Sequence, residues 1–128
     1  MIQKILVVDD SLVSRKIIKS CIPADRGYEI HEAVNGLEGV AKYKEIDPDV
    51  TLMDLTMPVM DGMQALEEIK AFDERAVVVV CTADVQMKTI SRVMSRGALM
   101  VVKKPITRNA INDALYRAEQ TITGHNRP

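Results

Sequence analysis

The chain has 128 residues, of which 47% are hydrophobic and 27% are charged, and its formal net charge at pH 7 is −1. Such a chain fits one globular domain that can bury a core, and its charge gives no overall field to attract nucleic acid or an anionic membrane. No apolar run approaches the roughly 20 residues that span a bilayer, and the first strand-like run starts too early to leave room for a signal peptide. The two cysteines, Cys21 and Cys81, lie in apolar segments without metal-type spacing, so we expect reduced core thiols in a cytoplasmic protein.

Two strand–helix units are predicted in the first half of the chain. Residues 5–8 are a β-branched apolar run, typical of a strand covered on both faces, and Ser11 can cap the helix that follows. Residues 28–34 are a less apolar strand that we expect near a sheet edge, and Asn35–Gly36 turns the chain into a second helix. The expected inner faces are Val13, Ile17, Ile18 and Cys21 in the first helix and Leu37, Val40 and Ala41 in the second.

Three further units complete the predicted fold. Strands are indicated at residues 50–53, 76–81 and 99–102, and each is followed by a helical pattern of apolar residues. The expected inner faces of these helices are Leu66 and Ile69, then Met87, Ile90, Val93 and Met94, then Ile111, Ala114, Leu115, Ala118 and Ile122. Five alternating units predict an α/β fold, a single-domain, doubly wound, five-stranded parallel sheet with right-handed crossovers. We expect this domain to span residues 1–123, with a flexible C-terminal tail at residues 124–128.

Polar side chains follow four of the five predicted strands directly. Asp9 and Asp10 follow the first strand, Asp54 the third, Thr82 the fourth and Lys104 the fifth. Taken singly, Asp54 would only cap a turn, and the acidic pair would only favour the start of a helix. Because the carboxyl ends of parallel strands lie along one edge of a sheet, we expect all five side chains to share one pocket.

The segment 54–62, with the sequence DLTMPVMDG, presents Asp54 at the start of a stiff loop. Pro58 removes a backbone donor and restricts the residue before it, and Asp61–Gly62 is a turn signal.

This pocket is suited to phosphoryl chemistry. Crowded carboxylates must take up protons or bind a cation, and oxygen-only ligands suit Mg²⁺, with Mn²⁺ as an alternative. A carboxylate such as Asp54 beside the cation can attack phosphorus and form an acyl phosphate. Lys104 would neutralise the phosphoryl oxygens, and its bond to Pro105 can be cis, which would fix its direction. Thr82 can hydrogen-bond the phosphoryl group.

The chain resembles the receiver domains of the two-component response regulators, in particular the stand-alone chemotaxis type. The resemblance rests on Asp9–Asp10, the segment 54–62, Thr82–Ala83 and Lys104–Pro105, which occur in this order after strands one, three, four and five. It implies a flavodoxin-like sheet with the strand order 2-1-3-4-5, and this order comes from the family.

The resemblance also implies roles for the site residues. Asp54 would accept the phosphoryl group from the phosphohistidine of a histidine kinase and would contribute to the metal site. Asp10 would bind Mg²⁺ directly, Asp9 largely through water, and the backbone carbonyl of Thr56 would be a further ligand. Lys104 would contact the phosphate. Such a domain is not a classical enzyme, because it catalyses only its own phosphorylation and dephosphorylation.

The predicted switch departs from the family at one position. Members usually carry Tyr or Phe three residues before the lysine, where this chain has Val101. We therefore expect the response to depend on the switch hydroxyl of Thr82, on Ala83 and on the loop after them. Thr56 and Asp84 occupy positions that we expect to tune the access of water to the acyl phosphate.

A basic surface is predicted in the last third of the chain. Residues 85–112 contain no carboxylate, whereas residues 25–61 are predominantly acidic. Surface charge is often only a solvated helix face, but a basic face also steers an acidic partner, and in this family it is the usual output surface. We expect a downstream target protein to bind at Lys88, Arg92, Arg96 and Lys103.

Several alternatives stay open. A phosphatase or mutase with an aspartate nucleophile generally needs a second acid two residues later, where this chain has Thr56. A flavodoxin-like cofactor carrier needs a phosphate-binding loop after the first strand, where Asp9 and Asp10 would repel phosphate. Within the family, a phosphorelay intermediate or phosphate sink, which passes the group to another histidine, is a third alternative that the sequence does not exclude. We expect no output domain after the last helix, so the chain should contact proteins and neither nucleic acid nor membrane. We expect it to be a monomer or a weak phosphorylation-dependent dimer. The alternative is that it is the receiver fragment of a larger regulator.

Overall fold

Five parallel strands form one sheet in a computed structural model that describes residues 1–125. The strands are β1 (Lys4–Val8), β2 (Glu29–Ala33), β3 (Val50–Asp54), β4 (Val78–Thr82) and β5 (Met100–Lys103). Their order in the sheet is β2-β1-β3-β4-β5, and all four pairings are parallel. The predicted α/β fold, its strand order and the edge position of the second strand are therefore confirmed.

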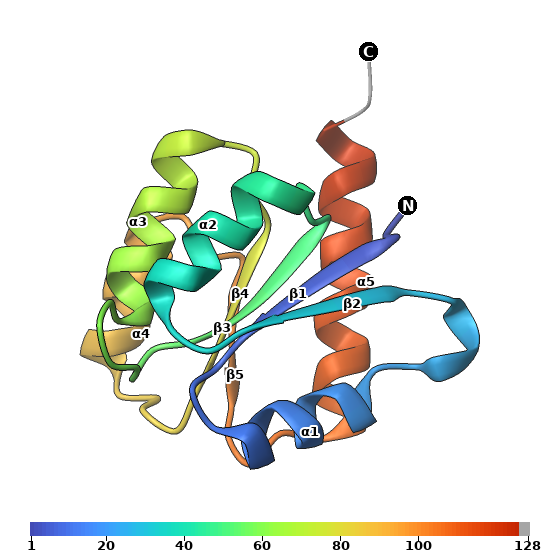
Figure 1. Cartoon of the computed structure of the whole chain (residues 1–128), viewed down its shortest axis with the longest axis horizontal. Helices are drawn as coiled ribbons and strands as arrows, with labels where there is room; N and C mark the ends of the chain where they lie inside the picture. The colour runs from blue at the N-terminus through green and yellow to red at the C-terminus, as the bar shows by residue number, and fades with distance from the viewer. Residues whose placement is uncertain (126–128) are drawn as a thin grey trace.

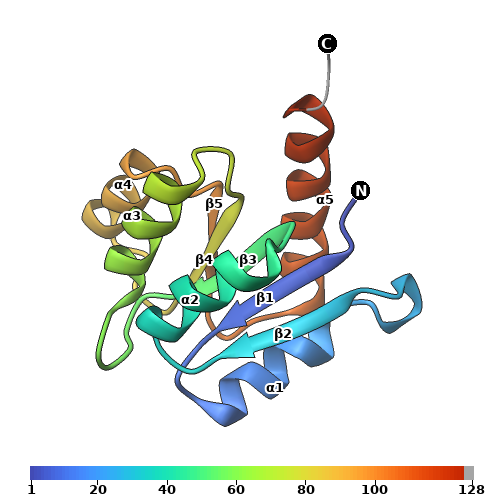
Figure 2. The ribbon, with the colours of Figure 1, turned by 45° about the horizontal axis from the view of Figure 1, so that its top comes forward.

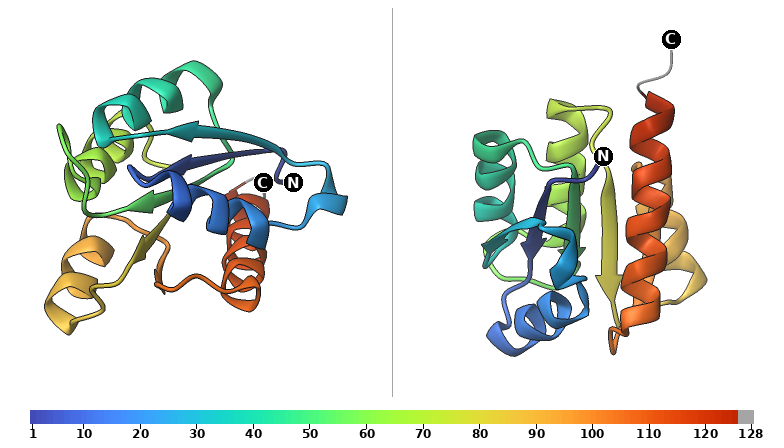
Figure 3. Two further views of the ribbon diagram at one scale, coloured as in Figure 1. Left: turned by 60° about the horizontal axis from the view of Figure 1, so that its bottom comes forward. Right: turned by 90° about the vertical axis from the view of Figure 1, so that its right-hand side faces the viewer.

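Helices follow the strands and cover both faces of the sheet (Figure 1). They are α1 (Leu12–Cys21), α2 (Gly36–Ile46), α3 (Gly62–Phe72), α4 (Met87–Ser95) and α5 (Arg108–His125), with a short 3₁₀ helix, η1 (Ala24–Arg26), after α1. Figure 3 shows α5 on the side of the sheet opposite to α2 and α3. The strand residues alternate between two cores, so Ile5 and Val7 pack with α1 and α5, whereas Leu6 and Val8 pack with α2, α3 and α4.

The buried face of α1 differs from the predicted one. Ile18 and Cys21 are buried as expected, but Val13 and Ile17 are exposed. Positions 13 and 17 form one stripe of the helix and positions 14, 18 and 21 form the neighbouring stripe, and the second stripe faces the sheet. Ser14 therefore lies on the side of α1 that is turned toward the end of β1.

The buried face of α2 also differs from the predicted one. Val40 is buried, but Leu37 and Ala41 are exposed, and the other buried positions are Gly36, Gly39 and Tyr43. Gly39 allows the helix to approach the sheet closely, because a Cβ atom there would lie 2.9 Å from a methyl carbon of Val8. The contact through a glycine explains why apolar spacing alone misplaced this face.

Of the remaining helices, α3 and α5 agree with the sequence, whereas the inner face predicted for α4 is largely wrong. The expected inner residues of α3 and α5 are buried except Ile122, which is partly buried at the edge of its core. On α4 only Val93 is buried, whereas Met87 and Met94 are exposed. This helix is therefore the one with the smallest buried face.

The end of the chain is helical further than predicted. The predicted tail begins at Gly124, but α5 continues to His125, so these two residues belong to the helix, while residues 126–128 of the tail lie outside the described residues. A single glycine costs a helix only about 1 kcal/mol, which the preceding turns of α5 can tolerate. None of the described helices is long and apolar enough to cross a membrane.

Candidate functional site

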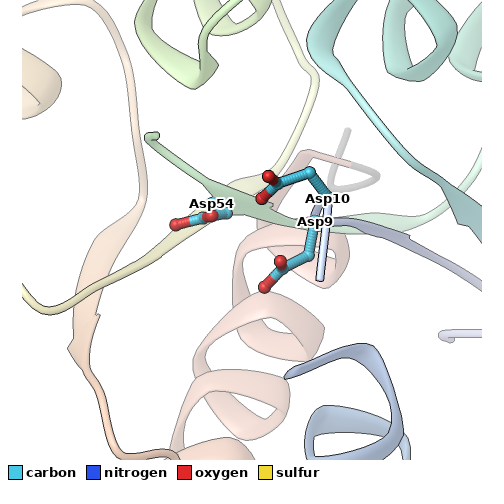
Figure 4. Close-up of side chains that lie close together, drawn as sticks. All are labelled: Asp9, Asp10 and Asp54. Carbon is cyan, nitrogen blue, oxygen red and sulfur yellow. The ribbon is translucent and has the colours of Figure 1, made fainter. Parts of the chain in front are cut away.

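Three aspartates meet at the carboxyl edge of the sheet, toward which the strand arrows point in Figure 2. Asp54 is the last residue of β3, and Asp9 follows β1 directly. These strands pair with Val8 opposite Met53, so Asp9 and Asp54 continue side by side. One carboxylate oxygen from each of Asp9, Asp10 and Asp54 lies within 4.8 Å of the others (Figure 4). The predicted convergence of the acidic residues is confirmed.

Lys104 closes the site from the side of β5. Its Nζ atom lies 3.0 Å from Oδ2 of Asp9 and 3.4 Å from Oδ1 of Asp54. Its backbone N–H donates to the carbonyl of Thr82 at 2.9 Å, which ties the end of β5 to the end of β4. The bond between Lys104 and Pro105 is cis.

The charges in the site act on one another in a largely buried setting. The Asp54 side chain is 10% exposed, and this burial raises the pKa of its carboxyl. The Lys104 ammonium lowers the pKa of Asp54 and the Asp9 carboxylate raises it, but burial is the largest effect. Burial lowers the pKa of Lys104, but the two carboxylates outweigh this effect and the net pKa is raised. Lys104 is therefore a firmly charged group at neutral pH.

The donor set fits a hard divalent cation. The group consists of carboxylates without histidine or cysteine, and such oxygen ligands are preferred by Mg²⁺ and Mn²⁺. Three carboxylates face one ammonium group, so the site keeps an excess of negative charge that a divalent cation would balance. Asp10 is exposed and faces solvent, whereas Asp9 and Asp54 are buried.

Asp9 is held in place by the first turn of α1. Its Oδ1 accepts the backbone N–H of Ser11 at 2.9 Å, and its Oδ2 accepts the hydroxyl of Ser14 at 2.5 Å. Arg15 donates to the backbone carbonyl of Asp9 at 2.7 Å and forms an ion pair with Glu32 of β2 at 2.9 Å. Ser14 and Arg15 were not predicted from the sequence. Helical spacing could have indicated Ser14, because it places Ser14 on the same side of α1 as the buried Ile18.

The loop after Asp54 is fixed by two glycines. The N–H of Gly62 donates to the carbonyl of Leu55 at 2.8 Å, and a Cβ atom on Gly62 would lie 2.0 Å from the carbonyl oxygen of Asp54. The N–H of Gly36 donates to the carbonyl of Met60 at 2.9 Å, and a Cβ atom there would lie 2.3 Å from that oxygen. The sequence marked Gly36 only as a turn residue, because its loop partner is remote in the chain.

The predicted switch residues lie at the carboxyl end of β4, in the loops after β3 and β4, and within β5. Thr82 is buried, and its Oγ1 accepts the backbone N–H of Asp84 at 3.1 Å. The carboxylate of Asp84 accepts the hydroxyl of Thr89 on α4 at 2.7 Å. Ala83 is exposed beside them, and Val101 is half-buried in the middle of β5. Thr56 lies in the exposed loop after Asp54.

The predicted basic surface is only partly free. Lys88 and Arg92 are exposed on α4, and Lys103 is exposed at the end of β5. Arg96 forms an ion pair with Glu67 of α3. Of the four predicted cations, Arg96 is therefore already neutralised within the domain, whereas the other three have no ion-pair partner among residues 1–125.

Comparison with known proteins gives this arrangement a family. Residues 5–116 match the family described as the response regulator receiver domain. The chain is 38% identical over 115 residues to the chemotaxis protein CheY of Listeria monocytogenes, covering 90% of this chain and 97% of that protein. It is 39% identical over 118 residues to the chemotaxis protein CheY of Bacillus subtilis, covering 91% of this chain and 98% of that protein.

A solved structure supports the same assignment. The fold matches a chain in the crystal structure of the CheX–CheY–BeF3–Mg²⁺ complex from Borrelia burgdorferi with a TM-score of 0.83 and 30% sequence identity, over 94% of this chain and 89% of that one. The resemblance inferred from the acidic pair, the loop after Asp54 and Lys104 is thus confirmed, and the chain belongs to the response regulator receiver domain family.

Proposed function

We propose that this receiver domain is a two-component signalling switch in which Asp54 accepts a phosphoryl group from the phosphohistidine of a histidine kinase. The observation that supports this proposal most strongly is the place of Asp54, a largely buried carboxylate between the ammonium of Lys104 and the carboxylates of Asp9 and Asp10. A donor of this kind acts in the cytoplasm, which is where the proposal places the protein.

The chemistry is a direct transfer. A carboxylate oxygen of Asp54 attacks phosphorus, the P–N bond of the phosphohistidine breaks, and the imidazole nitrogen keeps the electron pair and takes a proton from solvent. Lys104, which already contacts Asp54, holds a phosphoryl oxygen and offsets its charge. Mg²⁺, or Mn²⁺ in its place, supplies further charge neutralisation when it is bound by Asp10, Asp54 and the carbonyl of Thr56, with Asp9 acting through water.

The proposed switch begins at Thr82. Its hydroxyl accepts a hydrogen bond from the N–H of Asp84, so its own proton is free to be donated to a phosphoryl oxygen on Asp54. Asp84 in turn binds Thr89, so a movement of Thr82 is transmitted through this contact to α4. Because α4 has the smallest buried face of the long helices, it offers the least resistance to such a shift. Ala83, Thr56 and Asp84 border the route of water to the acyl phosphate.

A structure with a phosphate mimic bound tests the switch. We expect the Thr82 hydroxyl to turn toward the mimic and Asp84 to move with it, while Val101 keeps its place in β5. An unmoved Thr82 beside a rearranged β5 would contradict this mechanism.

The proposed output is a target protein that binds the basic surface of α4 and β5. Lys88, Arg92 and Lys103 carry this proposal, since Arg96 is held by Glu67. Replacing Lys88 and Arg92 by Glu should weaken the affinity for the target without slowing phosphorylation. Both side chains are exposed on α4, and among the described residues neither forms a hydrogen bond or ion pair with the aspartates of the site. An unchanged target affinity would exclude this surface.

Phosphorylation itself is tested with a small acyl-phosphate donor. We expect the intact mass to increase by one phosphate in the presence of Mg²⁺, and not in its absence or in the Asp54→Asn variant. Incorporation in Asp54→Asn would contradict the role of Asp54. Steady hydrolysis of a generic phosphomonoester would instead favour a phosphatase.

A further inference from the structure

The hydroxyl of Ser14 makes a contact with the acidic site that the proposed phosphoryl transfer does not need. Its Oγ donates to Oδ2 of Asp9 at 2.5 Å, and the Asp9 side chain is only 1% exposed. Ser14 belongs to the first turn of α1, on the stripe that carries the buried residues Ile18 and Cys21. The packing of these two residues fixes the position from which the hydroxyl reaches Asp9.

The carboxylate of Asp9 has little capacity left for a metal ion. Two carboxylate oxygens offer about four acceptor positions. Oδ2 accepts Ser14 at 2.5 Å and Lys104 at 3.0 Å, and Oδ1 accepts the backbone N–H of Ser11 at 2.9 Å. One position remains, on Oδ1. Asp9 therefore cannot bind a cation with both oxygens unless one of these hydrogen bonds is broken.

Ser14 is the donor that is dedicated to Asp9. The N–H of Ser11 is a backbone group, and Lys104 is shared between Asp9 and Asp54. The Ser14 hydroxyl has no other acceptor among the described side chains. Removing this hydroxyl frees one position on Oδ2 and leaves every other contact of Asp9 in place.

We propose that Ser14 is a positioning residue that sets the cation selectivity of the site, by keeping Asp9 out of direct bidentate coordination and thereby favouring Mg²⁺ over Ca²⁺. This inference rests on the proposed function, since it takes Asp10 and Asp54 as the direct carboxylate ligands.

The two cations differ in what a freed Asp9 would offer them. Mg²⁺ takes six ligands at about 2.0–2.1 Å, usually keeps several waters and uses one or two carboxylates. Ca²⁺ takes about 6–8 oxygen ligands at about 2.3–2.6 Å and readily accepts a bidentate carboxylate. A third carboxylate with a free acceptor position on each oxygen adds to a Ca²⁺ site and adds little to a Mg²⁺ site.

The test compares the affinities of the full chain for Mg²⁺ and for Ca²⁺, each followed by the amide NMR shifts of Asp10 and Asp54 during titration with the chloride salt. Partners of metal ligands typically change affinity by about 10–100-fold. We expect Ser14→Ala to increase the ratio of Ca²⁺ to Mg²⁺ affinity by about tenfold, and Ser14→Thr, which keeps the hydroxyl, to leave the ratio at the wild-type value. Ser20→Ala is the matched control, because the Ser20 hydroxyl on the same helix donates to the carbonyl of Ile17 and to no other group among the described residues.

A purely structural role would not change this ratio, because a loosened site loses affinity for both cations together. If Ser14→Ala unfolds, Ser14→Val is compared with Ser14→Thr, because the two side chains are of nearly equal size and only Thr carries the hydroxyl. An unchanged ratio in Ser14→Ala, or equal ratios in the Val and Thr variants, would overturn the proposal. Failure of the proposed function would look different, because the wild-type chain would then bind neither cation at Asp10 and Asp54.

Discussion

Lys104 lies 3.0 Å from Asp9, although 95 positions separate the two residues in the chain. This ion pair joins the end of β5 to the end of β1 across two intervening strands, β3 and β4. The ion pair gives the buried carboxylate of Asp9 its counter-charge. It also places the ammonium of Lys104 3.4 Å from Oδ1 of Asp54. The stability of the fold and the proposed chemistry of the site therefore depend on the same side chain.

Replacing Lys104 by Met should destabilise the domain in the absence of divalent cations. Removing one partner of a buried ion pair leaves the other charge uncompensated, which costs about 3 kcal/mol. Urea unfolding in the presence of a chelator measures this loss, and added Mg²⁺ should recover part of it by balancing Asp9 and Asp54. Lys103→Met is the matched control, because Lys103 is exposed and has no ion-pair partner in the described chain. Equal stability of the two variants would contradict this account.

Replacing Asp54 by Asn should stabilise the metal-free domain at neutral pH. Burial raises the pKa of Asp54 in the folded state, so the folded chain binds this proton more tightly than the unfolded chain and loses stability as the pH rises through the carboxyl range. Asn removes that loss because it has no charge to bury. The stability difference should be complete at pH 7 and should vanish below the ordinary carboxyl range, where the wild-type carboxyl is protonated in both states. A wild type that is more stable than Asp54→Asn at pH 7 without Mg²⁺ would show that the ion pair with Lys104 outweighs burial.

Replacing Gly62 by Ala should be strongly destabilising. The added Cβ atom would lie 2.0 Å from the carbonyl oxygen of Asp54, so the backbone of the site must shift, at a cost of about 3 kcal/mol or more. Gly124→Ala is the control, because its Cβ atom meets nothing within 4 Å among residues 1–125 and Ala favours a helix by up to about 1 kcal/mol. The urea midpoints should move in opposite directions. A Gly62→Ala variant of wild-type stability would show that the loop adapts without strain.

Replacing Thr51 by Val should stabilise the domain by about 1 kcal/mol. Thr51 lies within β3, fully buried, and its hydroxyl has no hydrogen-bond partner in the part of the chain that the structure describes. A buried polar group without a partner costs about 1–3 kcal/mol, and Val keeps the shape of Thr without the hydroxyl. Chemical denaturation at constant m-value provides the measurement. A loss of stability would indicate that the hydroxyl is satisfied in solution.

Much of the fold could be predicted from the sequence because the signals are local. Apolar runs of strand length, the helix cap at Ser11, and turn residues such as Asn35 and Gly62 all act within a few positions of one another. The polar residues at strand ends then converge because parallel strands share an edge. Asp9, Asp54 and Lys104 could therefore be predicted as neighbours from the sequence.

The parts that could not be predicted depend on contacts between distant segments. Apolar spacing on α1 offered two neighbouring stripes, and only packing against the sheet selects the stripe with Ile18 and Cys21. The same choice turns Ser14 toward Asp9. Two contacts join separate strand–helix units, so no local sequence pattern predicts them. They are the hydrogen bond between Gly36 and Met60 and the ion pair between Arg96 and Glu67.

Locating the acyl phosphate within the chain tests the central claim most directly. Borohydride reduces an acyl phosphate to an alcohol, so the chain is phosphorylated with a small acyl-phosphate donor and Mg²⁺, reduced, and mapped by peptide mass spectrometry. We predict that residue 54 alone is converted to the alcohol, and that omission of Mg²⁺ abolishes the conversion. Conversion at Asp9 or Asp10, or a chain that gains phosphate without any reducible acyl group, would contradict the account.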